Sequence, residues 1–130
     1  MGHIGFTPQS IHSLGGAKVQ GRGEYAERLI AEALAVQEAG AYAVVLELVP
    51  RELAAELTKR LTIPTIGIGA GNATDGQILV WTAFAGLYLG KPRKFVKQYL
   101  SLRADLLKAA TQYRTEVASG EFPSAENSHD

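Results

Sequence analysis

The sequence contains no cysteine, and it holds only one methionine and one tryptophan among its 130 residues. The lack of cysteine excludes a disulfide scaffold, a thiolate nucleophile and a thiolate-ligated metal, and it fits a reducing cytoplasm, which is the location we expect. An excess of charge is also missing, because thirteen basic and thirteen acidic residues cancel. Nucleic acid and anionic membranes are therefore not expected as partners.

Long hydrophobic runs are missing as well. The longest uncharged, mostly apolar stretch covers residues 78–90, whereas a membrane-spanning helix needs about 20 apolar residues. The first residues, Met1-Gly2-His3, do not form the basic and then apolar run of a signal peptide. With 46% apolar and 20% charged residues, the composition is that of a globular protein. We therefore expect the apolar stretch to lie in a protein core.

The clearest secondary-structure signal lies between residues 24 and 47. Apolar side chains recur at helical spacing and predict a helix over residues 24–39, with this buried face: Ala26, Leu29, Ile30, Ala33 and Leu34. Gly40 is placed to end the helix as its C-terminal cap. Residues 42–46 are then apolar throughout, which is typical of a strand buried on both faces in a parallel sheet. This strand ends at Glu47.

Similar patterns predict three further strand–helix units. The first unit contains the end of a strand over residues 2–6 and a short helix capped by Thr7, with Pro8 at its first position. The third contains a helix from Pro50 and a strand over residues 65–68. The fourth contains a strand over residues 77–80, followed by a helical region from Pro92. The apolar side chains of the last region are Phe95, Val96, Tyr99, Leu100, Leu106, Leu107, Ala110 and Tyr113.

The alternation of strands and helices favours an α/β architecture. No internal repeat, low-complexity tract or linker divides the chain, so we assign residues 1–120 to one domain. Residues 121–130 carry proline, serine and acidic residues without periodicity, and we expect them to form a flexible tail.

A carboxylate directly after an apolar strand is the best candidate for a catalytic group. Glu47 would lie at the C-terminal end of a parallel strand, which is where barrel enzymes place their active sites. Partial burial at that position would suit a general base. The alternative is a structural ion pair between Glu47 and an arginine or lysine of a neighbouring loop.

Two further candidates follow from the same sheet. His3 is expected on the same face as Glu47, where its imidazole could donate a hydrogen bond to a substrate oxygen, although a structural histidine is the alternative. The run Gly67-Ile68-Gly69-Ala70-Gly71 follows a strand, and its bare amides could hold an anion. Its spacing is not that of a dinucleotide site. The alternative for these glycines is a tight exit from the strand.

The remaining polar residues give weaker signals. Lys18 and Arg22 could hold an anion or could be solvated loop charges. His12 and His129 have no supporting context, and Asp75 before Gly76 is typical of a turn. Histidines and carboxylates do not cluster at metal-ligand spacing, so we predict no metal site within this chain.

Taken together, several segments resemble the ketopantoate hydroxymethyltransferase family, and the resemblance covers nearly the whole chain. The segments that carry it are Met1-Gly2-His3-Ile4-Gly5-Phe6-Thr7-Pro8-Gln9-Ser10, Leu14-Gly15-Gly16-Ala17-Lys18-Val19-Gln20-Gly21-Arg22, Val44-Val45-Leu46-Glu47-Leu48-Val49-Pro50, Ile63-Pro64-Thr65-Ile66-Gly67-Ile68-Gly69-Ala70-Gly71, Asp75-Gly76-Gln77-Ile78-Leu79-Val80 and Lys94-Phe95-Val96-Lys97. Several long matches in one order are far more specific than any single one.

The resemblance implies a (β/α)8 TIM-type barrel, of which this chain would supply about the last four strands and extra C-terminal helices. It implies a homo-oligomeric enzyme, commonly a decamer, that makes ketopantoate for pantothenate biosynthesis. The substrates would be the keto acid 3-methyl-2-oxobutanoate and the folate 5,10-methylenetetrahydrofolate, and a magnesium ion would hold the keto acid. By the match, Glu47 would be the general base, and His3 would line the substrate pocket.

Two departures from the family pattern matter. The magnesium ligands and a substrate-holding lysine belong to the first half of the barrel, which this chain lacks, so we expect a truncated form that is inactive alone. Ala83 stands where family members usually carry an aspartate. Two other functions remain open: a non-enzymatic half-barrel that assembles with a complementary chain, and a small phosphate-binding α/β domain that uses residues 67–71.

Overall fold

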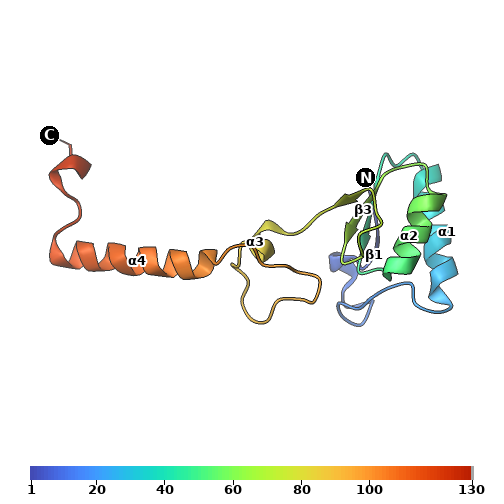
Figure 1. The fold of residues 1–130 in the computed structure, drawn as a ribbon, viewed down its shortest axis with the longest axis horizontal. Helices are drawn as coiled ribbons and strands as arrows, with labels where there is room; N and C mark the ends of the chain where they lie inside the picture. Colours follow the sequence, from blue (N-terminus) through green and yellow to red (C-terminus); the bar gives the residue numbers. More distant parts are fainter. Residues whose placement is uncertain (130) are drawn as a thin grey trace. The chain divides into compact units, whose positions relative to one another are not determined.

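The computed structural model describes residues 1–129, and the chain divides into two compact units, residues 1–79 and 80–130. The first unit is a parallel sheet with helices packed on it, and the described part of the second is helical with long connecting segments (Figure 1). The division falls inside residues 1–120. The expected single domain and flexible tail stay a prediction.

Four parallel strands form the sheet of the first unit, in the order β1-β2-β3-β4. These strands are β1 (Gly2–Gly5), β2 (Val44–Glu47), β3 (Thr65–Ile68) and β4 (Gly76–Gln77). The register places Glu47 opposite both Gly5 and Ile68, so the first three strands end at the same level. Parallel neighbours need crossover connections, which is the reason for the strand–helix alternation. The predicted α/β class is confirmed.

Two helices make the crossovers between the first three strands. α1 (Tyr25–Glu38) links β1 to β2, and α2 (Arg51–Arg60) links β2 to β3. Both lie on the same side of the sheet (Figure 1). The predicted helix over residues 24–39 is confirmed, with its end residues acting as caps. Gly40 follows with a φ of 88°, a conformation that glycine adopts without a steric penalty.

The core of the first unit lies between the sheet and these helices. Strand residues Ile4, Val44 and Leu46 are buried there against side chains of α1 and α2, namely Leu29, Ile30, Ala33, Leu53, Ala54 and Leu57. Successive side chains of a strand point to opposite faces. His3 and Glu47, one position away from the core residues, therefore lie on the face that the helices do not cover.

In the structure, the strand predicted over residues 77–80 is shorter and begins and ends at lower residue numbers. β4 covers Gly76–Gln77 alone, and Ile78 donates the last hydrogen bond to β3 (3.0 Å). From Val80 the chain turns into a short helix, α3 (Trp81–Phe84). A short apolar run does not by itself distinguish a strand from a helix, which explains the wrong boundary.

The prediction of a helix from Pro92 is also wrong at its start, because α4 covers Leu102–Ser119. The backbone N–H groups of Tyr99 and Leu100 donate to the carbonyl of Phe84 at 2.8 and 3.3 Å. These bonds to the end of α3 replace the bonds that a helix would make within itself. No helix within residues 1–129 is both long and apolar enough to cross a bilayer.

The short helices near the ends of the described chain differ in detail from the expectations. The predicted helix after Thr7 is a 3-10 helix, η1 (Pro8–Ser10), with proline at its first position as predicted. The Thr7 side chain makes no capping hydrogen bond, whereas its carbonyl accepts one from the Ser10 N–H. After α4 the chain forms one more 3-10 helix, η2 (Ala125–Asn127).

Candidate active site

Two of the predicted site residues, His3 and Glu47, meet on the uncovered face of the sheet. The imidazole Nε2 of His3 lies 3.1 Å from the carboxylate Oε2 of Glu47. His3 pairs in register with Val45, two residues before Glu47, so the contact is a diagonal one between adjacent strands. The Glu47 side chain is 12% exposed and that of His3 is 37% exposed. A small molecule can therefore reach the pair from solvent.

The charges around Glu47 suit a proton acceptor. A neutral imidazole that carries its proton on Nε2 donates to Oε2, and Oε1 has no hydrogen-bond partner within residues 1–129. Over the same residues, Glu47 pairs with no arginine or lysine, so the alternative of a structural ion pair with a basic loop residue is not what the structure shows. With Oε2 in contact with His3, Oε1 remains available to accept a proton.

The backbone of β1 packs closely around the backbone of Glu47. The N–H of Phe6 donates to the Glu47 carbonyl at 2.8 Å. Gly5 has a φ of 83°, and a Cβ atom there would lie 2.3 Å from the Glu47 carbonyl oxygen. Only glycine fits this approach, because any side chain would push the two strand ends apart. The glycine two residues after His3 is thus part of what holds the pair together.

The glycines of residues 67–71 form a close-packed exit from β3. Gly71 has a φ of 79°, and a Cβ atom there would lie 2.5 Å from the Cβ of Arg51, the first residue of α2. The Gly71 carbonyl accepts a hydrogen bond from the Gln77 side chain at 2.8 Å. These contacts account for the glycine at 71 by packing alone, which favours the tight strand exit over an anion site.

The sequence predicts that Asp75 is a turn residue. In the structure its side chain makes a more specific contact. Its Oδ2 accepts hydrogen bonds from the backbone N–H of Thr65 at 2.8 Å and from the Thr65 hydroxyl at 3.0 Å. These two bonds, the backbone one first, lower the pKa of the Asp75 carboxyl below its ordinary 3.8. Thr65 is the first residue of β3, at the end of the sheet opposite Glu47, so we assign this contact a structural role.

The remaining predicted candidates do not join the pair. Lys18 and Arg22 are exposed on the loop before α1, and neither makes an ion pair within residues 1–129. His12 and His129 are exposed as well, and Ala83 lies in α3. Across the described part of the chain, no group of three or more histidine, aspartate or glutamate side chains could hold a metal ion.

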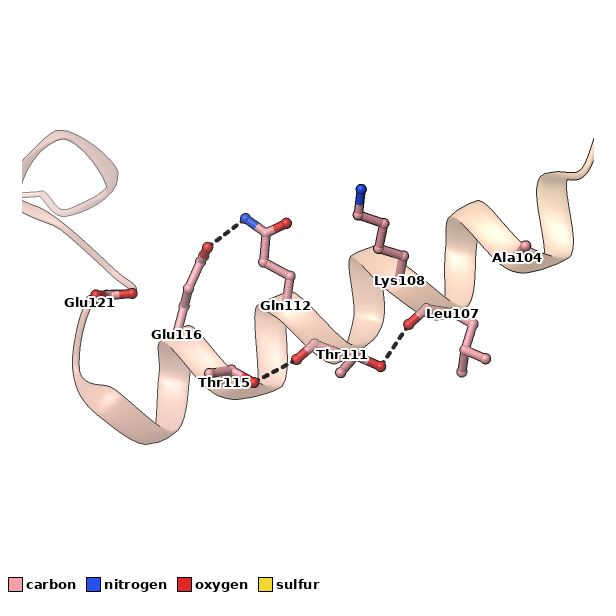
Figure 2. A pocket seen from close by; sticks show the side chains of 8 residues that line it. All are labelled: Ala104, Leu107, Lys108, Thr111, Gln112, Thr115, Glu116 and Glu121. Atoms are coloured by element: carbon pink, nitrogen blue, oxygen red, sulfur yellow. Dashed lines mark hydrogen bonds between the residues drawn. The ribbon is translucent and has the colours of Figure 1, made fainter.

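A pocket of about 620 Å³ lies along α4 in the other unit. Figure 2 shows its side chains, which are Ala104, Leu107, Lys108, Thr111, Gln112, Thr115, Glu116 and Glu121. Two threonine hydroxyls donate to carbonyls one turn earlier in the helix, and Gln112 donates to Glu116 at 2.7 Å. Its polar groups thus form hydrogen bonds within the helix rather than converging on a ligand. We therefore assign it neither a ligand nor a reaction.

The family model described as ketopantoate hydroxymethyltransferase matches residues 1–125. The chain belongs to this family. It is 59% identical over 127 residues to the 3-methyl-2-oxobutanoate hydroxymethyltransferase of Mycolicibacterium paratuberculosis, covering 98% of this chain and 45% of that relative. The enzymes of the same name from Mycobacterium ulcerans and Rhodococcus jostii are 58% and 56% identical, again over 98% of this chain, and 43% and 44% of those relatives are covered.

The chain spans less than half the length of these relatives and matches their C-terminal half. Four parallel strands, the first three of them linked by helices, in a chain about half as long as its relatives, are consistent with part of a (β/α)8 barrel. In such a barrel the C-terminal strand ends carry the active site, and Glu47 is the last residue of β2.

Proposed function

We propose that this chain supplies the proton-abstracting part of a 3-methyl-2-oxobutanoate hydroxymethyltransferase active site. The observation that carries the proposal is the 3.1 Å contact between His3 and Glu47 at the C-terminal end of the sheet. Family membership supports it, because the relatives carry that activity in their names. A cysteine-free chain suits the reducing cytoplasm, where we propose that the reaction takes place.

The chemistry of Glu47 in this proposal is a proton transfer. Oε1 takes a proton from the carbon next to the ketone of the keto acid, and the electron pair of that C–H bond moves onto the ketone oxygen to give an enolate. His3 holds the other carboxylate oxygen and so fixes the direction of Oε1. The enolate carbon then bonds to the methylene carbon of 5,10-methylenetetrahydrofolate. Both C–N bonds of that methylene group break, and the oxygen of one water becomes its hydroxyl group. The other proton of the water and the proton taken by Glu47 go to the two folate nitrogens, so the products are ketopantoate and tetrahydrofolate.

A magnesium ion, which the family resemblance implies, does not fit this chain alone. Residues 1–129 bring no cluster of carboxylates and histidines together, and Mg²⁺ requires several oxygen ligands in octahedral geometry. We propose that the metal ligands and the folate site belong to residues outside this chain. The proton transfer assigned to Glu47 is therefore the part of the reaction that these residues can explain.

The test joins this chain to the part of a relative that it does not cover. We would fuse the N-terminal part of the M. paratuberculosis relative to residues 1–130 and measure ketopantoate formation with 5,10-methylenetetrahydrofolate and magnesium. We expect turnover by the fusion and little or none by the chain alone. Substitution Glu47→Gln in the fusion should lower kcat by roughly 10²–10⁴-fold, with a smaller change in KM, because it keeps the shape and removes the base.

Three outcomes would contradict this proposal. Robust turnover by the 130-residue chain alone would show that no essential part lies outside it. Near-normal turnover of the Glu47→Gln fusion would show that Glu47 is structural. A fusion that folds, as judged by circular dichroism, but makes no ketopantoate would refute the proposed activity itself.

We also propose that the chain works in a homo-oligomer. Within residues 1–129, ten of the fifteen exposed large apolar side chains lie between residues 80 and 117, and large exposed apolar surfaces mark interaction sites. α4 has no buried residue, and its Leu106, Tyr113 and Val117 lie at helical spacing on one face. Light scattering should give a mass of several subunits for the fusion, and Leu106→Lys with Val117→Lys should reduce it. An unchanged mass would exclude this face as the contact.

A further inference from the structure

Leu48, the residue directly after Glu47, has an unusual backbone. Its φ is 51°, and within residues 1–129 it is the one non-glycine residue with a positive φ. L-residues avoid this region because Cβ approaches a backbone carbonyl oxygen, and a bulky side chain there is a clear outlier. Such conformations persist only where the surroundings enforce them, and they cluster at functional sites.

Two hydrogen bonds from different segments hold Leu48 in this conformation. Its N–H donates to the carbonyl of Ile68, the last residue of β3, at 3.0 Å. Its carbonyl accepts from the N–H of Gln20, in the loop before α1, at 2.8 Å. In a strand that continued, the N–H and carbonyl of one residue would face the same neighbouring strand. The left-handed conformation instead turns the carbonyl towards the loop and ends β2.

The same arrangement fixes the peptide unit between Glu47 and Leu48. The Glu47 carbonyl accepts from the Phe6 N–H on the β1 side, and the Leu48 N–H donates on the β3 side. The Leu48 side chain is buried. The loop end is stiffened in turn, because the Gln20 side chain donates to the Lys18 carbonyl at 3.0 Å. Three segments thus meet at the backbone that carries the carboxylate.

We propose that Leu48 is a positioning residue of the Glu47 base, acting on its backbone, whereas His3 contacts its carboxylate. Its left-handed backbone ends β2 one residue after Glu47, joins the loop at Gln20 to β3, and so fixes the direction in which the carboxylate meets His3. Leu48 has no reactive group and acts through Glu47. The predicted effect on turnover rests on the proposed function, whereas the effect on the contact between His3 and Glu47 does not.

The test separates backbone conformation from apolar packing. Leu48→Gly and Leu48→Asn tolerate a positive φ but lose the buried apolar side chain. Leu48→Val and Leu48→Ile keep an apolar side chain but resist a positive φ, because they are branched at Cβ. In the fusion we expect kcat to fall by roughly 10²-fold in the β-branched pair, with little change in KM. The Gly and Asn variants should stay close to the parent kcat.

A readout that does not need turnover is the ¹⁵N chemical shift of His3 Nε2, which reports its hydrogen bond to Glu47. Glu47→Ala in the 130-residue chain gives the reference value for a lost contact. The β-branched variants should move towards that reference, and the Gly and Asn variants should keep the parent shift. If the parent fusion has no turnover, the proposed function fails, and this shift still decides the role of Leu48.

The proposal is overturned if apolar packing, rather than backbone conformation, determines which Leu48 variants keep their activity. If Val and Ile keep the kcat and the nitrogen shift while Gly and Asn lose them, Leu48 serves the core and not the base. If all four variants match the parent, its backbone is immaterial to the site. Should the β-branched variants not fold, Leu48→Ala against Leu48→Gly repeats the comparison, because these two differ only by the Cβ atom that disfavours a positive φ. Equal kcat values and equal shifts in that pair would refute the proposal.

Discussion

His3 and Glu47 are 44 residues apart in the sequence, and their side chains meet at 3.1 Å across two adjacent parallel strands. The contact depends on strand register, since each residue lies on the sheet face that the helices leave uncovered. It occupies one carboxylate oxygen of Glu47. In the proposed reaction, His3 would therefore orient Glu47 as well as line the site.

Removing this donor should lower turnover of the fusion. A hydrogen bond to a charged group contributes about 1.5–3 kcal/mol, so His3→Ala should reduce kcat by roughly 10–100-fold if the bond is needed in the transition state. His3→Gln can place an amide N–H near the position of Nε2 and should restore part of the loss. Steady-state kinetics of both variants test this. If the Gln variant is as slow as the Ala variant, the imidazole has a role other than orienting the carboxylate.

Much of the first unit could be predicted because its signals are local. The apolar run over residues 42–46 and the helical spacing over residues 24–39 each reflect burial of one element, and the structure places β2 and α1 there. The nearness of His3 to Glu47 followed from the same reasoning, because parallel strands of one sheet bring their ends together.

The features that the sequence did not reveal depend on contacts between segments. The helix expected from Pro92 starts only at Leu102, and the N–H groups of Tyr99 and Leu100, which such a helix would bond internally, donate instead to the carbonyl of Phe84. The left-handed backbone of Leu48 leaves no pattern in a run of apolar residues. Asp75 looks like an ordinary turn residue until its partner, ten positions earlier, is placed beside it.

The contact between Asp75 and Thr65 should make the stability of the chain depend on pH. The hydrogen bonds from Thr65 lower the pKa of Asp75 in the folded state below 3.8. The folded state therefore binds this proton less tightly than the unfolded state does. The stabilisation is present above the ordinary pKa and is lost as the pH falls through the lowered one. Asp75→Asn should be less stable at neutral pH, and its stability should change less in acid.

Urea unfolding between about pH 7 and about pH 2 measures this dependence. Glu52→Gln is the matched control, because the pKa of Glu52 is also lowered, mainly by its hydrogen bond to the exposed Arg51. Exposed ion pairs contribute little, so the control should keep the acid-side loss of stability that Asp75→Asn lacks. Parallel curves for the parent and Asp75→Asn would show that another group causes the acid sensitivity.

The close approach of β1 to Glu47 predicts an unequal effect of two glycine substitutions. Gly5 and Gly40 have nearly the same φ, 83° and 88°, but only the Cβ of an alanine at position 5 would meet other atoms. Gly40→Ala should cost about 1 kcal/mol from the backbone conformation alone. Gly5→Ala adds a clash with the Glu47 carbonyl oxygen and should cost about 3 kcal/mol or more.

The two glycine variants also separate stability from site geometry. Urea unfolding of each variant gives the cost in free energy, and kcat of the fusion reports the position of Glu47. Gly5→Ala should lower kcat, because the strand end that carries His3 must move away from Glu47, whereas Gly40→Ala lies beyond α1 and should leave kcat unchanged. Equal free-energy costs together with an unchanged kcat in Gly5→Ala would mean that β1 can shift without disturbing the pair.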